Sequence, residues 1–105
     1  DMLIIKGVNV FPSQIEGVLL SFKEIGSTYE IIVTREDYKD KLEVKVELVD
    51  DSIVGDYGAI EKLSREIKHA LRTVLQIDAK LTITEHMSLA RSEGKAKRVI
   101  DLRKY

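Results

Sequence analysis

Two short segments of the chain carry residue types that could do chemistry. One is residues 6–16, near the start, and the other is residues 89–101, which include Gly94 and Lys95. A lysine on a long flexible arm beside a glycine can bring one positive charge to an oxyanion or phosphate that gains charge in a transition state. Most loop lysines are only solvated, so residue type alone leaves both interpretations open.

The usual catalytic and metal-binding patterns are missing from the sequence. The chain has no cysteine, which excludes disulfides, thiol catalysis and Cys-based zinc sites. His69 and His86 are isolated from each other, and we expect no metal site from them. There is no Walker-type phosphate loop. The net charge of −1 argues against a dedicated nucleic-acid binder, and the acidic stretch 36–51 is expected to be a solvated surface.

The composition is that of one ordinary globular domain. Its 105 residues are enough for a single hydrophobic core, with 44% hydrophobic and 33% charged residues. No apolar run approaches the roughly 20 residues that a membrane-spanning helix needs, and no signal peptide is evident. We therefore expect a cytoplasmic protein without membrane contact. The chain starts at Asp1 with no initiator methionine, which favours a piece of a longer protein.

The first part of the sequence predicts a hairpin followed by a helix. Residues 2–10 are apolar on both sides of a break at Gly7, and glycine readily adopts the positive φ of a tight turn. Ser13, with Glu16 three residues later, is the pattern of a helix N-cap with a capping box. Apolar residues then recur at helical spacing. We expect the Gly-Ser pair at 26–27 to end this helix.

The next segment predicts a second hairpin. Residues 29–35 are rich in strand formers, and the polar run 36–40 separates them from residues 42–48. In residues 42–48 apolar and charged side chains alternate, which is typical of a strand with one solvated face. The charged residues of this strand, Glu47 among them, are assigned to that solvated face.

A second amphipathic helix and a third strand complete the predicted fold. A connection at 55–58 leads to a helix with apolar residues three or four apart between 60 and 75. Residues 81–83 favour a strand, 87–98 a loop, and 99–102 a short strand or a terminal turn of helix. Each helix needs an apolar surface on which to bury its stripe. We therefore predict an α+β fold: a small, mainly antiparallel sheet with two amphipathic helices packed on it, preceded by a short N-terminal hairpin.

The two segments named first resemble two motifs of one superfamily, the acyl-adenylate-forming enzymes. Residues 1–16 look like the second half of the superfamily's linker motif, Met-Ile-Lys-x-x-Gly-x-x-x-x-Pro-x-Glu-Ile-Glu. The wording Ile-Lys-Gly-Val-Asn-Val-Phe-Pro-Ser-Gln-Ile-Glu at 5–16 is similar to the phenylacetate–CoA ligase branch more than to acetyl- or long-chain relatives. Residues 91–98 look like that branch's terminal Gly-Lys motif, and residues 29–47 are also in its style.

The resemblance implies a two-step reaction with ATP, Mg²⁺ and CoA. Acid and ATP give acyl-AMP and pyrophosphate, and CoA then displaces AMP to give the thioester. Residues 1–105 would be a single C-terminal lid domain, and its partner would be the enzyme's own large N-terminal AMP-binding domain. The lid would rotate between two poses, with an aryl acid, ATP and CoA at the domain interface. The resemblance implies no nucleic-acid or membrane partner.

The resemblance also implies roles for individual residues. Lys95 would be the catalytic lysine of the adenylation step, with Gly94 beside it. Lys6, Gly7 and Val8 would help to line the pantetheine channel of CoA in the thioester-forming step. The hinge residue and the nucleotide site lie upstream of this sequence, so the chain alone should be inactive.

One departure and two other interpretations stand beside this resemblance. Residues 90–93, Ala-Arg-Ser-Glu, replace the Pro-Arg-Thr that commonly precedes the superfamily's terminal motif, whereas the Gly-Lys core is intact. A non-enzymatic α+β ligand-sensing or interaction module would have the same layers, because fold does not settle function, and it predicts a self-complementary dimer with ligand pockets at its interface. An RNA-binding module could use the basic C-terminal segment, but the chain lacks an aromatic cluster on a sheet face.

Overall fold

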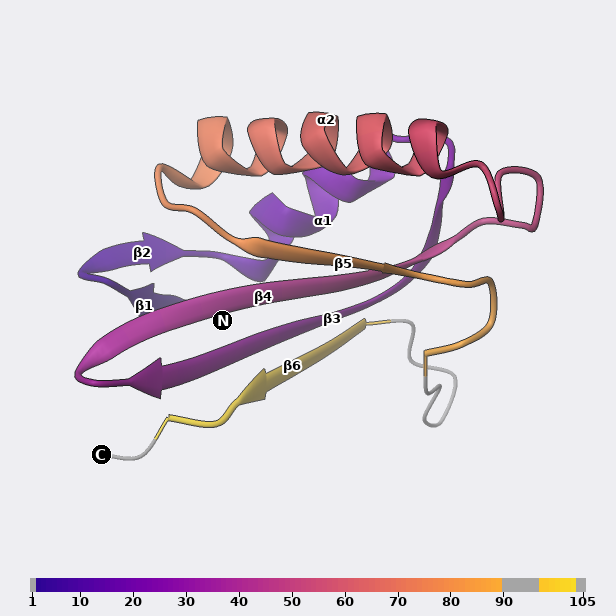
Figure 1. The fold of residues 1–105 in the computed structure, drawn as a ribbon. Helices are drawn as coiled ribbons and strands as arrows, with labels where there is room; N and C mark the ends of the chain where they lie inside the picture. Colours follow the sequence, from indigo (N-terminus) through magenta and orange to yellow (C-terminus); the bar gives the residue numbers. More distant parts are fainter. Residues whose placement is uncertain (1, 90–96, 104–105) are drawn as a thin grey trace.

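The computed structural model describes residues 2–89 and 97–103 and contains two helices and six strands within them. A small hairpin comes first, then a helix, a long hairpin, a long helix and two further strands (Figure 1). The elements in chain order are β1 Leu3–Ile5, β2 Val8–Val10, α1 Pro12–Leu20, β3 Ile25–Glu36, β4 Lys39–Leu48, α2 Tyr57–Leu75, β5 Lys80–Thr84 and β6 Lys97–Asp101. The predicted α+β class and the N-terminal hairpin are confirmed.

The main sheet is mixed, with the strand order β5-β4-β3-β6. Its centre is the antiparallel pair β3–β4, joined by a two-residue turn at Asp37 and Tyr38, both of which have positive φ. The edge strands are parallel to their neighbours, β5 to β4 and β6 to β3. The expectation of a mainly antiparallel sheet therefore holds for the central pair and not for the edges. The crossover through α2 returns the chain to the start of the sheet, so β5 runs in the same direction as β4.

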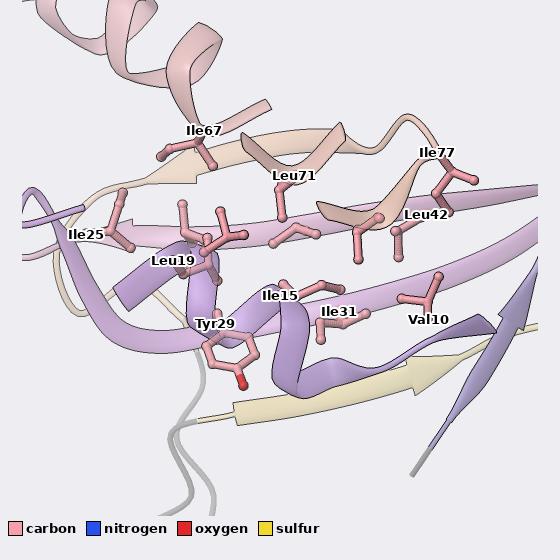
Figure 2. Packing of buried hydrophobic residues seen from close by; sticks show 14 of the residues in the cluster. Val10, Ile15, Leu19, Ile25, Tyr29, Ile31, Leu42, Ile67, Leu71 and Ile77 are labelled. Carbon is pink, nitrogen blue, oxygen red and sulfur yellow. The ribbon is translucent and has the colours of Figure 1, made fainter. Parts of the chain in front are cut away.

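Both helices cover one face of the main sheet (Figure 1). The buried stripe of α2 consists of Leu63, Ile67, Leu71 and Leu75, which belong to one hydrophobic cluster with the inward side chains of β3 and β4. Figure 2 shows two of them, Ile67 and Leu71, in this cluster together with Ile31 of β3 and Leu42 of β4. Helix α1 adds Ile15, Val18 and Leu19 to the same core. The predicted apolar face of α2 is thus largely confirmed, although Val74 at its edge is 44% exposed.

The outward face of β4 is less solvated than its charged residues predict. Leu42, Val44, Val46 and Leu48 are buried, as the alternation predicts, but Glu47 is also buried, with 1% of its surface exposed. Its carboxylate accepts a hydrogen bond from the backbone N–H of Leu89 at 3.1 Å. The assignment of Glu47 to a solvated face is therefore wrong, because the chain after β5 returns across this end of β4.

The N-cap of helix α1 lies two residues before the predicted cap at Ser13. Phe11 is the N-cap residue and Pro12 is the first helical residue. The Phe11 N–H donates to Gln14 Oε1 at 3.0 Å. Proline is favoured at this first position because its φ is preset and its missing N–H would have no helical partner, so the predicted cap at Ser13 is wrong.

The end of α1 also differs from the prediction. The helix ends at Leu20, and residues 26–27 already belong to β3, so they do not terminate the helix. Ser21 follows as the C-cap residue, and its hydroxyl donates to the Val18 carbonyl at 2.6 Å. At the other end of the chain, residues 97–101 form β6, which confirms a strand there rather than a helical turn. None of the helices in the described ranges is long and apolar enough to cross a membrane.

Candidate functional site

The turn of the β1–β2 hairpin contains two of the predicted site residues, Lys6 and Gly7, and the third, Val8, begins β2. Ile5 and Val8 are opposite each other, so Lys6 and Gly7 alone make the turn, with φ of 53° and 74°. Positive φ at both central residues is typical of the type I′ turn, whose twist matches that of the strands. A Cβ added to Gly7 would meet no heavy atom within 4 Å. Glycine is therefore required here by its backbone conformation and not by crowding, and the tip of the turn is open.

The base of the same hairpin is fixed in the core. Ile5 and Val10 are completely buried and belong to the main hydrophobic cluster. Lys6, Gly7 and Asn9 are exposed. The sequence thus builds an exposed tip on a buried apolar base, which holds Lys6, Gly7 and Val8 together beside the start of β4.

Asp40, at the start of β4, receives three donors next to this turn. The backbone N–H of Lys6 donates to Oδ2 at 3.0 Å, Arg35 Nε donates to Oδ1 at 2.8 Å, and Arg103 Nη1 donates to Oδ2 at 3.2 Å. The Lys6 N–H, followed by the Arg35 guanidinium, holds the pKa of the Asp40 carboxyl below its ordinary value. Asp40 is therefore ionised near neutral pH and ties the turn to β3, β4 and the C-terminal segment.

Arg103 is more buried than Arg35, the other arginine of this cluster: 4% of its side chain is exposed, against 33% for Arg35. Its Nε and Nη2 donate to the two carboxylate oxygens of Asp101 at 3.0 and 2.9 Å, and its Nη1 also donates to the carbonyl of Ile4. Paired, charge-assisted bonds of this kind fix the plane of a guanidinium. The Arg103 contact also lowers the pKa of Asp101. An open depression of about 530 Å³ lies over these groups, between the hairpin and residues 35, 40, 101 and 103.

The Asp40–Arg103 pair was not predictable from the sequence. Asp40 lies in the acidic stretch that was expected to be only a solvated surface, and Arg103 is 63 residues further along the chain. No local pattern indicates such a contact, because it depends on β6 lying beside β3 at the edge of the sheet. The nearest local signal in the sequence is Gly7, and it indicates only the turn.

The second predicted site segment is described by the structure only at its two ends. Gly94 and Lys95 lie outside the described residues. The described chain stops at Leu89, whose N–H is held by Glu47, and resumes at Lys97, which lies opposite Tyr29 in the sheet. Both of these flanks lie at the Tyr29 end of the sheet, whereas the hairpin turn lies beside the β3–β4 turn at the other end (Figure 1).

Glu16, the last residue of the first motif, has a role different from the predicted cap. The hydroxyl of Tyr29 donates to Glu16 Oε2 at 2.7 Å, which joins α1 to β3. Figure 2 shows the Tyr29 ring among the core side chains with its hydroxyl at the rim. Burial, followed by the hydrogen bond to Glu16, raises the pKa of the Tyr29 hydroxyl above its ordinary value. The hydroxyl therefore stays protonated and serves as a donor that fixes the position of α1.

The histidines are separate in space as well as in sequence. His69 is exposed on α2, and His86 Nδ1 lies 3.2 Å from the carbonyl oxygen of Leu48. Within residues 2–89 and 97–103, no three residues of the types His, Cys, Asp and Glu gather in a group that could hold a metal ion. The chemistry that the described residues can provide is therefore an exposed turn and a fixed cluster of charges.

The fold is an α+β domain with an N-terminal hairpin and with β6 as an edge strand near the C-terminus. The family described as "AMP-binding enzyme C-terminal domain" matches residues 7–103, and the chain belongs to this family. The resemblance stated from the two motifs is thereby confirmed.

Several individual CoA ligases are also similar to this chain. Phenylacetate-coenzyme A ligase of Escherichia coli (strain K12) is 40% identical over 103 residues, which are 98% of this chain and 24% of that protein. A crystallised domain of phenylacetate-coenzyme A ligase from Bacteroides vulgatus superimposes with a TM-score of 0.89 at 40% identity, covering 99% of this chain and 94% of that one. A 2-hydroxyisobutyryl-CoA ligase in complex with 2-HIB-AMP and CoA, in the thioesterification state, has a TM-score of 0.87 at 36% identity, covering 99% of this chain and 22% of that one. The chain spans about a quarter of the length of the curated relatives it matches.

Proposed function

We propose that the chain is the mobile C-terminal lid of an ATP-dependent acid–CoA ligase of the phenylacetate–CoA ligase type. The observation that carries this proposal is the similarity to phenylacetate-coenzyme A ligases along 98% of the chain. The enzyme converts acid, ATP and CoA into acyl-CoA, AMP and pyrophosphate in the cytoplasm. Its large N-terminal domain is the partner of residues 1–105 and binds the aryl acid and most of the ATP.

In the first half-reaction, the lid supplies Lys95. Its ammonium group meets the negative charge that grows on the carboxylate and α-phosphate oxygens as acyl-AMP forms. Gly94 beside it gives the backbone the freedom to approach the nucleotide closely. The described residues contain no carboxylate cluster for Mg²⁺. We assign the Mg²⁺ of the reaction to ATP and the large domain.

In the second half-reaction, the lid presents the tip of the β1–β2 hairpin. Lys6, Gly7 and Val8 lie next to the pantetheine arm of CoA and help to close the channel through which its thiol reaches acyl-AMP. The open space around Gly7 supports this role, because a narrow substrate arm can approach a turn that carries no side chain there.

The position of these two segments in the fold supports a rotating lid. The residues that flank Lys95 lie at the Tyr29 end of the main sheet, and the hairpin turn lies at the opposite end. A rigid domain with its two functional segments at opposite ends presents one or the other to a fixed active site by turning as a body. Each pose completes the site for one half-reaction.

Measurement of the two half-reactions in the full-length enzyme tests this proposal. Lys95→Ala is expected to slow acyl-AMP formation by about 100- to 1,000-fold, since it removes one preorganised charge from the transition state. The conversion of supplied acyl-AMP and CoA to acyl-CoA is expected to remain nearly unchanged, because the lysine is turned away in that pose.

Lys97→Ala is the matched control, because it removes a lysine two residues away, at the start of β6. It is expected to change acyl-AMP formation much less than Lys95→Ala does. Equal damage by the two substitutions, or a parallel loss of both half-reactions in Lys95→Ala, would contradict the assignment of Lys95 to adenylation.

A further inference from the structure

The β1 strand has one edge that β2 does not cover. The pairs Leu3↔Val10, Ile4↔Asn9 and Ile5↔Val8 occupy its other edge. The Ile4 carbonyl and the Lys6 N–H face outward from this hairpin, two residues apart, as the successive groups that a third strand would bind. A hairpin of two strands is marginally stable on its own, and an uncovered edge exposes unpaired polar groups.

Two side chains occupy this uncovered edge. Asp40 Oδ2 accepts from the Lys6 N–H at 3.0 Å, and Arg103 Nη1 donates to the Ile4 carbonyl. The two groups also bind each other, Nη1 to Oδ2, at 3.2 Å. Acceptor and donor therefore stand side by side and replace the backbone groups of a third strand.

Each member of the pair is held by a further charge. Arg35 Nε binds the second oxygen of Asp40 at 2.8 Å, and Asp101 binds Arg103 through both of its oxygens. The side chains of Arg103 and Asp40 are only 4% and 10% exposed. A nearly buried group with several fixed hydrogen bonds keeps one geometry, whereas an exposed ion pair does not.

We propose that Asp40 and Arg103, named here the edge clamp, are positioning residues for the thioester-forming step. They hold the tip at Lys6–Gly7–Val8 at one angle to the main sheet, so that CoA meets a preformed channel wall. This proposal rests on the proposed function of the turn. The buried Ile5 and Val10 fix the base of the hairpin, so loss of the clamp releases the tip without removing the core.

The kinetic test uses the full-length ligase and its two half-reactions. Asp40→Asn and Arg103→Met are each expected to lower kcat/KM for CoA in thioester formation about tenfold, because displacement of a binding wall by an ångström weakens the productive geometry. Adenylation is expected to change by less than about twofold, since that pose does not use the turn. Arg103→Lys is not expected to restore the rate, because an ammonium group cannot bind Asp101 as a fork and reach Asp40 and Ile4 as well.

Lys41→Met is the matched control variant. Lys41 is also a cation on β4, paired with Glu36 at 2.9 Å, but the side chains of this pair are 58% and 66% exposed. It is expected to leave both half-reactions unchanged.

The structural readout is hydrogen exchange of the same full-length variants. The peptide that contains residues 2–8 is expected to exchange at least about tenfold faster in Asp40→Asn and Arg103→Met, while peptides from the centres of β3 and β4 keep their wild-type rates. Unchanged exchange at the hairpin, or equal losses in the two half-reactions, would overturn the clamp while the ligase function stands. If the wild-type enzyme forms no acyl-CoA, the proposed function fails, and the exchange comparison alone decides whether the pair holds the hairpin.

Discussion

Asp40 shows how a residue that looks ordinary in the sequence becomes central in the fold. It lies in a stretch of alternating charges, where solvation is the simplest expectation. In the structure its carboxylate accepts from Lys6, Arg35 and Arg103, which come from three separate parts of the chain. Residue type and spacing predicted the turn at Gly7, because φ is a local property. They could not predict the partner of the turn, which depends on how distant strands are ordered.

The lowered pKa of Asp40 predicts a pH dependence of stability. Its pKa lies below the ordinary value of 3.8, so the folded state favours the carboxylate. The resulting stabilisation is complete above the ordinary pKa and is lost as the pH falls through the lower folded-state value. Urea unfolding of this chain between pH 7 and pH 3 is expected to show a free energy of unfolding that decreases below about pH 4.

Comparison of two variants isolates the contribution of Asp40. Asp40→Asn is expected to be less stable than wild type at pH 7 and to lose less stability on acidification. Asp78→Asn is the control, since Asp78 is 84% exposed and lies 3.5 Å from Arg72. It is expected to follow the wild-type pH dependence. A wild-type slope in Asp40→Asn would mean that the Asp40 carboxylate does not contribute to acid sensitivity.

At the scale of elements, the features predicted correctly from the sequence are those that depend on the local spacing of apolar residues. The apolar spacing of α2 and the alternation in β4 follow directly from side chains that face the core. The parallel edges of the sheet were not predictable in this way, because β5 and β6 find their neighbours through long connections. The buried Glu47 was missed for the same reason: its partner, Leu89, is 42 residues away. Helix α1 was misplaced at its start because a proline at the first position outweighs a serine cap.

The β1–β2 turn allows its backbone and its open tip to be tested separately. Gly7→Leu and Gly7→Asn both add a side chain, but asparagine tolerates positive φ and leucine does not. In this chain Gly7→Asn is expected to cost less than about 1 kcal/mol of unfolding free energy, and Gly7→Leu about 1–2 kcal/mol. No steric clash adds to either cost, because the space around Gly7 is open.

In the full-length enzyme, both Gly7 variants are expected to impair thioester formation more than adenylation, since either side chain would occupy the space that we propose for the pantetheine arm. Stopped-flow measurement of the two half-reactions, beside urea unfolding of this chain, provides the comparison. Normal thioester formation in Gly7→Asn would show that the open tip is not a binding surface for CoA.

On the scale of the whole molecule, the core is continuous, and the turn at Lys6 and Gly7 is exposed outside it. One hydrophobic cluster includes residues from the first hairpin, both helices and the central strands. The family was predictable from the two motifs at the ends of the sequence. The relative position of the hairpin turn and the residues that flank the second motif was not predictable, because it depends on the order and direction of the strands, which a motif does not specify.

The continuous core and the short length relative to the relatives give a prediction for the chain alone. Residues 1–105 are expected to unfold in one cooperative transition, with coincident circular dichroism and fluorescence signals. They are expected to form no acyl-CoA from acid, ATP and CoA, because the chain spans about a quarter of the curated relatives. An assay of free CoA thiol checks this second part. Acyl-CoA formation by the chain alone would refute the assignment as a lid that depends on a large domain.

The contact between Arg103 and Ile4 has a consequence for biosynthesis. The two residues are 99 positions apart, so the group that covers the edge of the first hairpin is among the last of the domain to be made. At the usual translation rates, about 5 to 20 s pass between the addition of Ile4 and that of Arg103. During this interval a nascent hairpin has no cation at its outer edge. The proposed edge clamp can therefore form only after Arg103 has been added and has emerged from the ribosome.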